Sequence, residues 1–166
     1  MTTLNVLHEP NPQLRQVSQD VSTDMIGTTQ LKEFIEQMKV TMNDERGIGI
    51  AAPQVGKLWR VILVDRGNDV MALVNPIIER VSETVAAGEE GCLSVPGVWG
   101  IVERPTHIRF RATTVLGKSI ELKAAHLFAR VVQHEIDHLN GILFIDKATK
   151  IYRVDQHNKD KRSSAL

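Results

Sequence analysis

The sequence predicts an α+β fold in which antiparallel strands pack around a central helix. Three observations support this prediction: a helical pattern near the N-terminus, short alternating segments separated by turn residues in the middle, and a second helical pattern towards the C-terminus. Helices that precede and follow a run of strands are typical of α+β folds. A length of 166 residues fits a single domain with a substantial core, and residues from about 149 to 166 read as a polar C-terminal tail.

The first 26 residues read as an irregular arm, because prolines at positions 10 and 12 interrupt any periodic pattern. A helix is expected over about 29–42, since its apolar residues fall on one face, namely Leu31, Phe34, Ile35, Met38 and Met42. A loop with several glycines is expected over 47–56.

Short strands are expected over 60–64, 70–75 and 77–81, followed by one over 108–113 in which Ile108, Phe110 and Ala112 share a face. A turn at 116–118 then leads back into a partner strand over 119–123. The segment 124–139 contains no glycine or proline, and Gly141 follows it as a helix stop signal. This segment is the second predicted helix.

Composition excludes several classes of function. The 20 basic and 20 acidic residues give a formal net charge of zero, so no general attraction to nucleic acid or to an anionic membrane is indicated. The N-terminus lacks the basic and apolar regions of a signal peptide, and no apolar run reaches transmembrane length. The one cysteine, Cys92, rules out an internal disulfide and fits a reducing compartment such as the cytoplasm.

The second predicted helix carries the segment His-Glu-Ile-Asp-His at 134–138. Histidines four positions apart lie on one helix face, so His134 and His138 can bind one metal ion with Glu135 beside it as a general base. Cys92 would supply a third ligand as a thiolate. Three protein ligands leave one coordination position open for water, which is typical of catalytic rather than structural metal sites.

Two apolar residues extend the histidine face of this helix. Val131 and Leu127 precede His134 by three and seven positions. They suit a hydrophobic substrate pocket beside a metal, and they equally suit ordinary core.

The glycine loop begins Gly-Ile-Gly-Ile-Ala-Ala at 47–52, which matches a dinucleotide-binding pattern by letter. That pattern requires a strand before it and a helix after it. Here a helical pattern precedes it and Pro53 stands where a helix should run, so nucleotide binding is rejected. The glycines instead let the backbone approach a ligand closely, with Gln54 as a polar side chain beside it.

Three segments in order, 47–54, 90–94 (Glu-Gly-Cys-Leu-Ser) and 134–138, closely resemble the motifs of peptide deformylases. These enzymes remove the formyl group from the N-terminal methionine of new bacterial or organellar proteins. The resemblance implies a metal-dependent hydrolase in the cytoplasm or an organellar matrix. It implies one divalent metal ion per chain, natively Fe(II), with Zn(II) or Ni(II) also accepted.

The resemblance also assigns roles to individual residues. Cys92, His134 and His138 would bind the metal, and Glu135 would act as general acid and base for the metal-bound water that attacks the formyl carbon. Gln54 and the backbone N–H of Leu93 would hold the oxyanion.

Substrate binding is implied at a second group of residues. Gly49 would contact the peptide backbone, while Ile48, Leu127 and Val131 would line a slot for the methionine side chain. The binding partner implied by the resemblance is the N-formylmethionyl nascent peptide. The basic C-terminal tail from about 149 either touches the ribosome transiently or is simply solvated. Many relatives place an arginine shortly after the cysteine motif, where this chain has Val98-Trp99-Gly100. If Trp99 replaces that arginine, aromatic packing takes the place of a polar contact to the bound peptide backbone.

Some residues and alternatives stay open at this point. Glu90 either supports a metal ligand or forms a surface salt bridge, and the remaining histidines are read as structural or exposed: His8, His107, His126 and His157. A metalloprotease would need a third His or Glu ligand downstream, where the candidates lie in the polar tail. A noncatalytic, metal-stabilised binding module would need a closed four-ligand shell, and no second cysteine exists to complete one.

Overall fold

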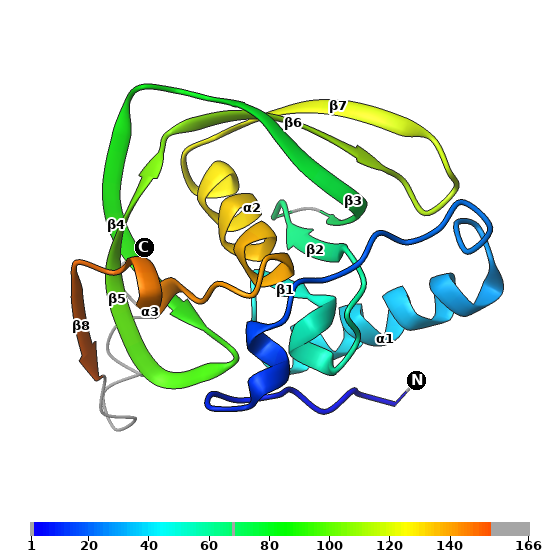
Figure 1. The fold of residues 1–166 in the computed structure, drawn as a ribbon, viewed down its shortest axis with the longest axis horizontal. Coiled ribbons are helices and arrows are strands. Elements are labelled where there is room, and N and C mark those ends of the chain that lie inside the picture. Colours follow the sequence, from blue (N-terminus) through cyan, green and yellow to red (C-terminus); the bar gives the residue numbers. More distant parts are fainter. Residues whose placement is uncertain (1, 68, 154–166) are drawn as a thin grey trace.

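The computed structural model describes residues 2–67 and 69–153. Helix α2 (His126–Leu139) runs through the middle of the molecule, and two antiparallel sheets and helix α1 (Thr29–Asp44) surround it (Figure 1). The expected α+β fold with a central motif-bearing helix is therefore confirmed. None of the described helices is long and apolar enough to cross a membrane.

The larger sheet has five strands in the order β1-β2-β3-β6-β7, and the smaller has three in the order β4-β5-β8. The five strands are β1 (Gly49–Ala51), β2 (Val61–Asp65), β3 (Val70–Val81), β6 (His107–Thr113) and β7 (Ser119–Ala125). The three strands are β4 (Val85–Cys92), β5 (Val95–Pro105) and β8 (Lys150–Arg153). Three short elements complete the fold, namely η1 (Pro12–Arg15), η2 (Ala52–Val55) and α3 (Phe144–Lys147).

Both helices pack on the larger sheet, one on each face. Strand β2 is buried on both sides: Ile62 and Val64 pack in the cluster around α2, whereas Val61 and Leu63 pack with the apolar face of α1. A strand covered on both faces reads as a continuous apolar run. The apolar stripe predicted for the first helix is buried as expected.

Several predicted elements are confirmed with small shifts. The first helix continues to Asp44, and the second starts at His126 because residues 124–125 still belong to β7. Gly141 has a φ of 72°, which suits a glycine just after a helix. Strands β6 and β7 form the expected hairpin.

Other predictions were wrong in informative ways. The two strands expected over 70–75 and 77–81 are the single strand β3, with a register shift at Asn75 and Pro76 that breaks the sequence pattern without ending the strand. The loop expected over 47–56 contains β1 and η2. The polar tail expected from about 149 stays a prediction: its described part forms strand β8, which pairs with β5, and 154–166 lie outside the described residues.

The long hairpin β4–β5 was not predicted. Its first strand reads Val-Ala-Ala-Gly-Glu-Glu-Gly-Cys, which is rich in residues of low strand propensity. This hairpin lies along one side of α2 (Figure 1). It brings the Cys92 Sγ to 3.2 Å from His138 Nε2.

Candidate metal centre and active site

Cys92, His134 and His138 form a compact cluster of metal-ligand side chains. The Cys92 Sγ lies 3.2 Å from His138 Nε2, and one donor atom from each of the three residues lies within 4.8 Å of the others. Metal–ligand bonds of about 2.0–2.3 Å place the ligands of a tetrahedral site roughly 3.5 Å apart. One thiolate and two imidazoles at these separations fit a single divalent ion.

The two histidines are held on one face of α2, with ring centroids 5.0 Å apart. Burial lowers the pKa of His138, which favours the neutral imidazole that a metal ligand must be. Burial would also lower the pKa of His134, but hydrogen bonds to Cys92 and Glu90 raise it instead. The helix thus presents both rings to the sulfur atom delivered by the hairpin.

Glu90 is part of the site and not a surface residue. It is 5 % exposed, and its Oε2 lies 2.8 Å from His134 Nδ1. A carboxylate in this position accepts the Nδ1 proton and leaves Nε2 free to bind a metal. Burial would raise the pKa of Glu90, but the hydrogen bonds from Arg104 and His134 lower it far below its ordinary value.

Two arginines clamp the same carboxylate. Arg104 donates to both Glu90 oxygens, at 2.6 and 2.8 Å, and Arg130 donates to Oε1 at 2.8 Å. Arg104 also donates to Asp137 at 2.8 Å, and Lys147 donates to Asp137 in turn. This chain of alternating charges, buried except at Lys147, fixes the orientation of Glu90 and, through it, of His134.

Arg130 also ties the smaller sheet to α2. It donates to the backbone oxygens of Val102 and Ala86, at 2.9 and 2.7 Å, and its guanidinium lies directly over Gly88. A Cβ on Gly88 would lie 2.8 Å from Arg130 Nη2. The glycine is therefore what leaves room for the arginine.

Glu135 is buried beside the cluster with one oxygen, Oε2, without a hydrogen-bond partner. The pKa of Glu135 is raised to about 7, mainly because burial disfavours the charged carboxylate. A Cβ on Gly49 would overlap Glu135 Oε1 and would lie 2.8 Å from Val131 Cγ1. Only glycine lets β1 pass this close to the carboxylate.

Gln54 presents its amide nitrogen to the cluster. Its Oε1 accepts the backbone N–H of Ala51 at 2.8 Å, and its Nε2 donates to Ser94 Oγ at 3.1 Å and to Cys92 Sγ at 3.4 Å. Leu93 lies in the tight connection between β4 and β5, directly after Cys92. An N–H donor from Gln54 thus points towards the candidate metal ligand Cys92.

The predicted slot residues differ in burial. Val131 is 7 % exposed and belongs to the core cluster under α2, whereas Leu127, one turn earlier, is 64 % exposed. Ile48 precedes β1 and is 50 % exposed. Strand β1 packs against α2, and the exposed Ile48 immediately precedes Gly49, which lies close to Glu135 and Val131.

The strands that carry Gly49 and Cys92 are both edge strands. Strand β1 ends the five-stranded sheet, and β4 ends the three-stranded sheet. Each therefore has one side without a partner strand in the described part of the chain. An edge strand can accept an extended peptide by main-chain hydrogen bonding.

Comparison with known proteins identifies the family. The family model described as polypeptide deformylase matches residues 3–154. The chain belongs to the polypeptide deformylase family. A peptide deformylase from Caldicellulosiruptor bescii is 48 % identical over 134 residues, covering 81 % of this chain and 79 % of that protein. One from Hydrogenovibrio crunogenus is 41 % identical over 168 residues, covering 99 % of this chain and 97 % of that protein.

Solved deformylase structures share the fold. A class I type b enzyme from Acinetobacter baumannii, bound to Met-Ala-Ser, has a TM-score of 0.85 and 36 % identity, covering 89 % of this chain and 99 % of that one. A peptide deformylase from Synechococcus elongatus in complex with actinonin has a TM-score of 0.84 and 39 % identity, covering 89 % of this chain and 79 % of that one. This family is metal-dependent, and the chain is a hydrolase that removes the N-formyl group from newly made polypeptides.

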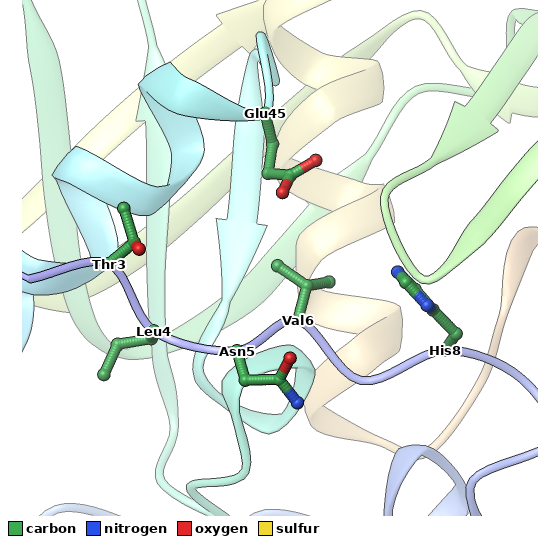
Figure 2. A pocket seen from close by; sticks show the side chains of 6 residues that line it. All are labelled: Thr3, Leu4, Asn5, Val6, His8 and Glu45. Atoms are coloured by element: carbon green, nitrogen blue, oxygen red, sulfur yellow. The ribbon is translucent and has the colours of Figure 1, made fainter.

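The other histidines that the structure describes lie outside the candidate metal-ligand cluster. His107 and His126 pack against each other, with ring centroids 5.2 Å apart, and His157 is outside the described residues. His8 lines a cavity of about 380 Å³ between the N-terminal arm and the end of α1 (Figure 2). Its other lining residues are Thr3, Leu4, Asn5, Val6 and Glu45, so none of the predicted site residues lines it.

Proposed function

We propose that Cys92, His134 and His138 bind the catalytic metal and that Glu135 is the general acid and base of deformylation. The observation that carries this proposal is the meeting of the three ligand side chains with Glu135 and Gly49 at one point, where β1, β4 and α2 come together. When bound, the metal would supply the Lewis acidity that activates water.

The protein side chains then have separate tasks. Glu135 takes a proton from the attacking water and gives it to the departing nitrogen, a role for which a pKa near neutrality is well suited. Gln54 Nε2 and the backbone N–H of Leu93 donate to the formyl oxygen as it gains negative charge. Glu90 holds His134 in the correct orientation throughout.

The formyl peptide binds as an extended strand between the edges of β1 and β4. The formyl end of the peptide must reach the metal beside Gly49, while the rest of the peptide must reach solvent. Beyond Gly49, β1 leads into Ala51 and Ala52, which are fully buried, whereas Ile48 on the other side is half exposed. The peptide therefore leaves over Ile48, antiparallel to β1, and its methionine side chain lies among Ile48, Leu127 and Val131.

We propose Fe(II) as the native metal, with Zn(II) and Ni(II) as substitutes. A thiolate with two imidazoles suits any of these ions and excludes magnesium. The reaction would take place in a bacterial cytoplasm or an organellar matrix, where nascent chains carry formylmethionine and Cys92 stays reduced. Ribosome contact is assigned to the basic tail, which falls mostly outside the described residues.

Neither alternative is favoured. A metalloprotease would draw its third ligand from a downstream His or Glu, but the one cluster of potential metal ligands within residues 2–67 and 69–153 takes Cys92 from upstream. A closed structural site would need a fourth protein ligand, and this cluster has three.

The test combines metal analysis with a deformylation assay on formyl-Met-Ala-Ser. Protein purified without oxygen should contain about one divalent ion per chain and release formate. Removal of the metal with a chelator should abolish turnover, and Fe(II), Ni(II) or Zn(II) should restore it. Unchanged activity in metal-free protein, or no deformylation by fully loaded protein, would contradict the proposal.

A further inference from the structure

Trp99 is an exposed aromatic residue next to the proposed metal centre. It has no part in the proposed reaction steps. It lies on β5 directly opposite Gly91 of β4, and Gly91 immediately precedes Cys92. The Trp99 side chain is 39 % exposed. A Cβ on Gly91 would lie 3.1–3.3 Å from three atoms of the indole, so the ring extends from β5 across the edge strand β4.

The two faces of the β4–β5 hairpin have different surroundings. Gly100, Val102 and Arg104 on β5 are buried on the inner face, where Gly100 and Val102 pack near Phe144 of α3 and Arg104 reaches Asp137 of α2. Glu90 on β4 reaches His134 of α2 on that same face. Trp99 and Glu103 alternate with these residues and are exposed. Trp99 therefore lies on the outer face, beside the free edge of β4.

The alternation of an extended substrate sets which of its side chains meets Trp99. This step rests on the proposed binding of the formyl peptide between β1 and β4. If the methionine side chain points inward towards α2, the side chain of the second residue points outward. Residues opposite each other on neighbouring strands share a face, and Gly91 contributes no side chain there. The first side chain that the second substrate residue meets is then Trp99.

We propose that Trp99 is a specificity-determining residue that recognises the second residue of the formyl peptide. Its indole forms an apolar shelf at the mouth of the site, which favours an aromatic or large aliphatic side chain after formylmethionine over glycine or aspartate. Contact with an aromatic side chain is expected to raise kcat/KM roughly two- to tenfold.

The experiment measures kcat/KM of the metal-loaded enzyme for four peptides, formyl-Met-X-Ser with Gly, Asp, Leu or Phe at X. The wild type should prefer Phe and Leu. Trp99→Ala should lose this preference, with a much larger loss of kcat/KM on the Phe and Leu peptides than on the Gly peptide, and Trp99→Phe should keep part of it. Ile101→Ala is the matched control, because Ile101 is the next residue of β5 on the same face and lies farther from Cys92.

A purely structural role for Trp99 as a cover for Gly91 predicts a different outcome. Trp99→Ala would then lower the rate on all four peptides by one factor, or the wild type would show no preference, and either result overturns the proposal. Should Trp99→Ala fail to fold, the indole emission of the wild type provides the test. It should change on binding of Met-Phe-Ser more than of Met-Gly-Ser, and equal changes would overturn the proposal.

These outcomes are distinct from failure of the proposed function. If the fully loaded wild type deformylates none of the four peptides, the proposed function has failed. If it deformylates them all equally, only the assignment of Trp99 has failed.

Discussion

The proposed metal centre and the proposed methionine slot lie side by side, yet they are built differently. His134, Glu135, Gln54 and Glu90 are 1–9 % exposed, and their polar atoms are mostly fixed by hydrogen bonds. Two of the three slot residues, Ile48 and Leu127, are at least half exposed. The centre is organised before substrate arrives, whereas the slot is an open apolar surface that the methionine side chain itself would cover.

This difference separates what each region contributes. Preorganised donors and acceptors stabilise charge as it develops, and this affects the rate of the chemical step. Apolar contacts to a substrate side chain contribute about 1–3 kcal/mol and mainly decide which substrate reacts. Changes at the centre should therefore have large effects on every substrate, and changes at the slot smaller effects that depend on the substrate.

The largest effect is expected for Glu135→Ala. The metal ligands stay in place but the group that transfers the proton is lost, so turnover should fall by about 10²–10⁴ with metal content unchanged. Metal analysis and kcat on formyl-Met-Ala-Ser check this outcome, with Glu36→Ala on the exposed side of α1 as the control. A metal-loaded Glu135→Ala variant with near-normal turnover would contradict the assignment.

Cys92→Ser should act through the metal. A hydroxyl is a much poorer ligand than a thiolate at neutral pH. Loss of a residue that only hydrogen-bonds to a ligand weakens metal binding roughly 10–100-fold. Loss of the ligand itself should therefore speed dissociation of the ion by more than that. The rate of metal transfer to a coloured chelator measures this. Since Cys92 also packs against a small apolar cluster, thermal unfolding of both metal-free proteins serves as the control for folding. Unchanged chelator kinetics would mean that Cys92 is only a core residue.

Gly88→Ala tests the arginine clamp around Glu90. The added methyl group would meet the guanidinium of Arg130 and move it away from Glu90, so the metal should dissociate up to about tenfold faster. Arg130→Met should have a similar effect. Because both changes remove one interaction, the double variant should be no worse than Arg130→Met alone, and fully additive effects would show that Gly88 acts by another route.

The comparison also explains what the sequence could and could not predict. Glu135, Gln54 and the two proposed histidine ligands could be predicted because their spacing is local: two histidines one helical turn apart, and a glutamine beside a glycine loop. Cys92 could be predicted because it is the only cysteine in the sequence. Arg104 and Arg130 were missed because they reach Glu90 over 14 and 40 positions of sequence, and no periodic pattern records such a contact.

The same limit applies to the fold. Alternating strands such as β6 were predicted because one of their faces is buried, whereas β4 was missed because glycines and alanines replace the apolar alternation. Those small residues have a function in the structure. Gly88 makes room for Arg130, and Gly91 lies under Trp99. The same small residues that made the strand hard to predict therefore allow these two large side chains to pack beside the candidate site.

The smallest effect is expected at the slot, where Leu127 and Val131 can be compared on one helix. Leu127 is largely exposed, so Leu127→Ala should change the free energy of unfolding by no more than about 0.5 kcal/mol. Val131 is buried against Gly49 and the core, so Val131→Ala should destabilise the fold by about 1–3 kcal/mol.

Leu127→Ala should have little effect on stability but a clear effect on substrate selection. Leu127→Ala should lower kcat/KM for a formyl-Met peptide by about five- to tenfold and leave formyl-Gly and formyl-Ala peptides nearly unchanged, because a small side chain never contacts Leu127. Urea unfolding and kcat/KM on the three peptides, measured on the same metal-loaded preparations, provide the check. If Leu127→Ala slows all three peptides equally, the slot lies elsewhere and Leu127 is only an exposed apolar residue. If it destabilises the fold as much as Val131→Ala does, the contrast between a prebuilt centre and an open slot is wrong at this position.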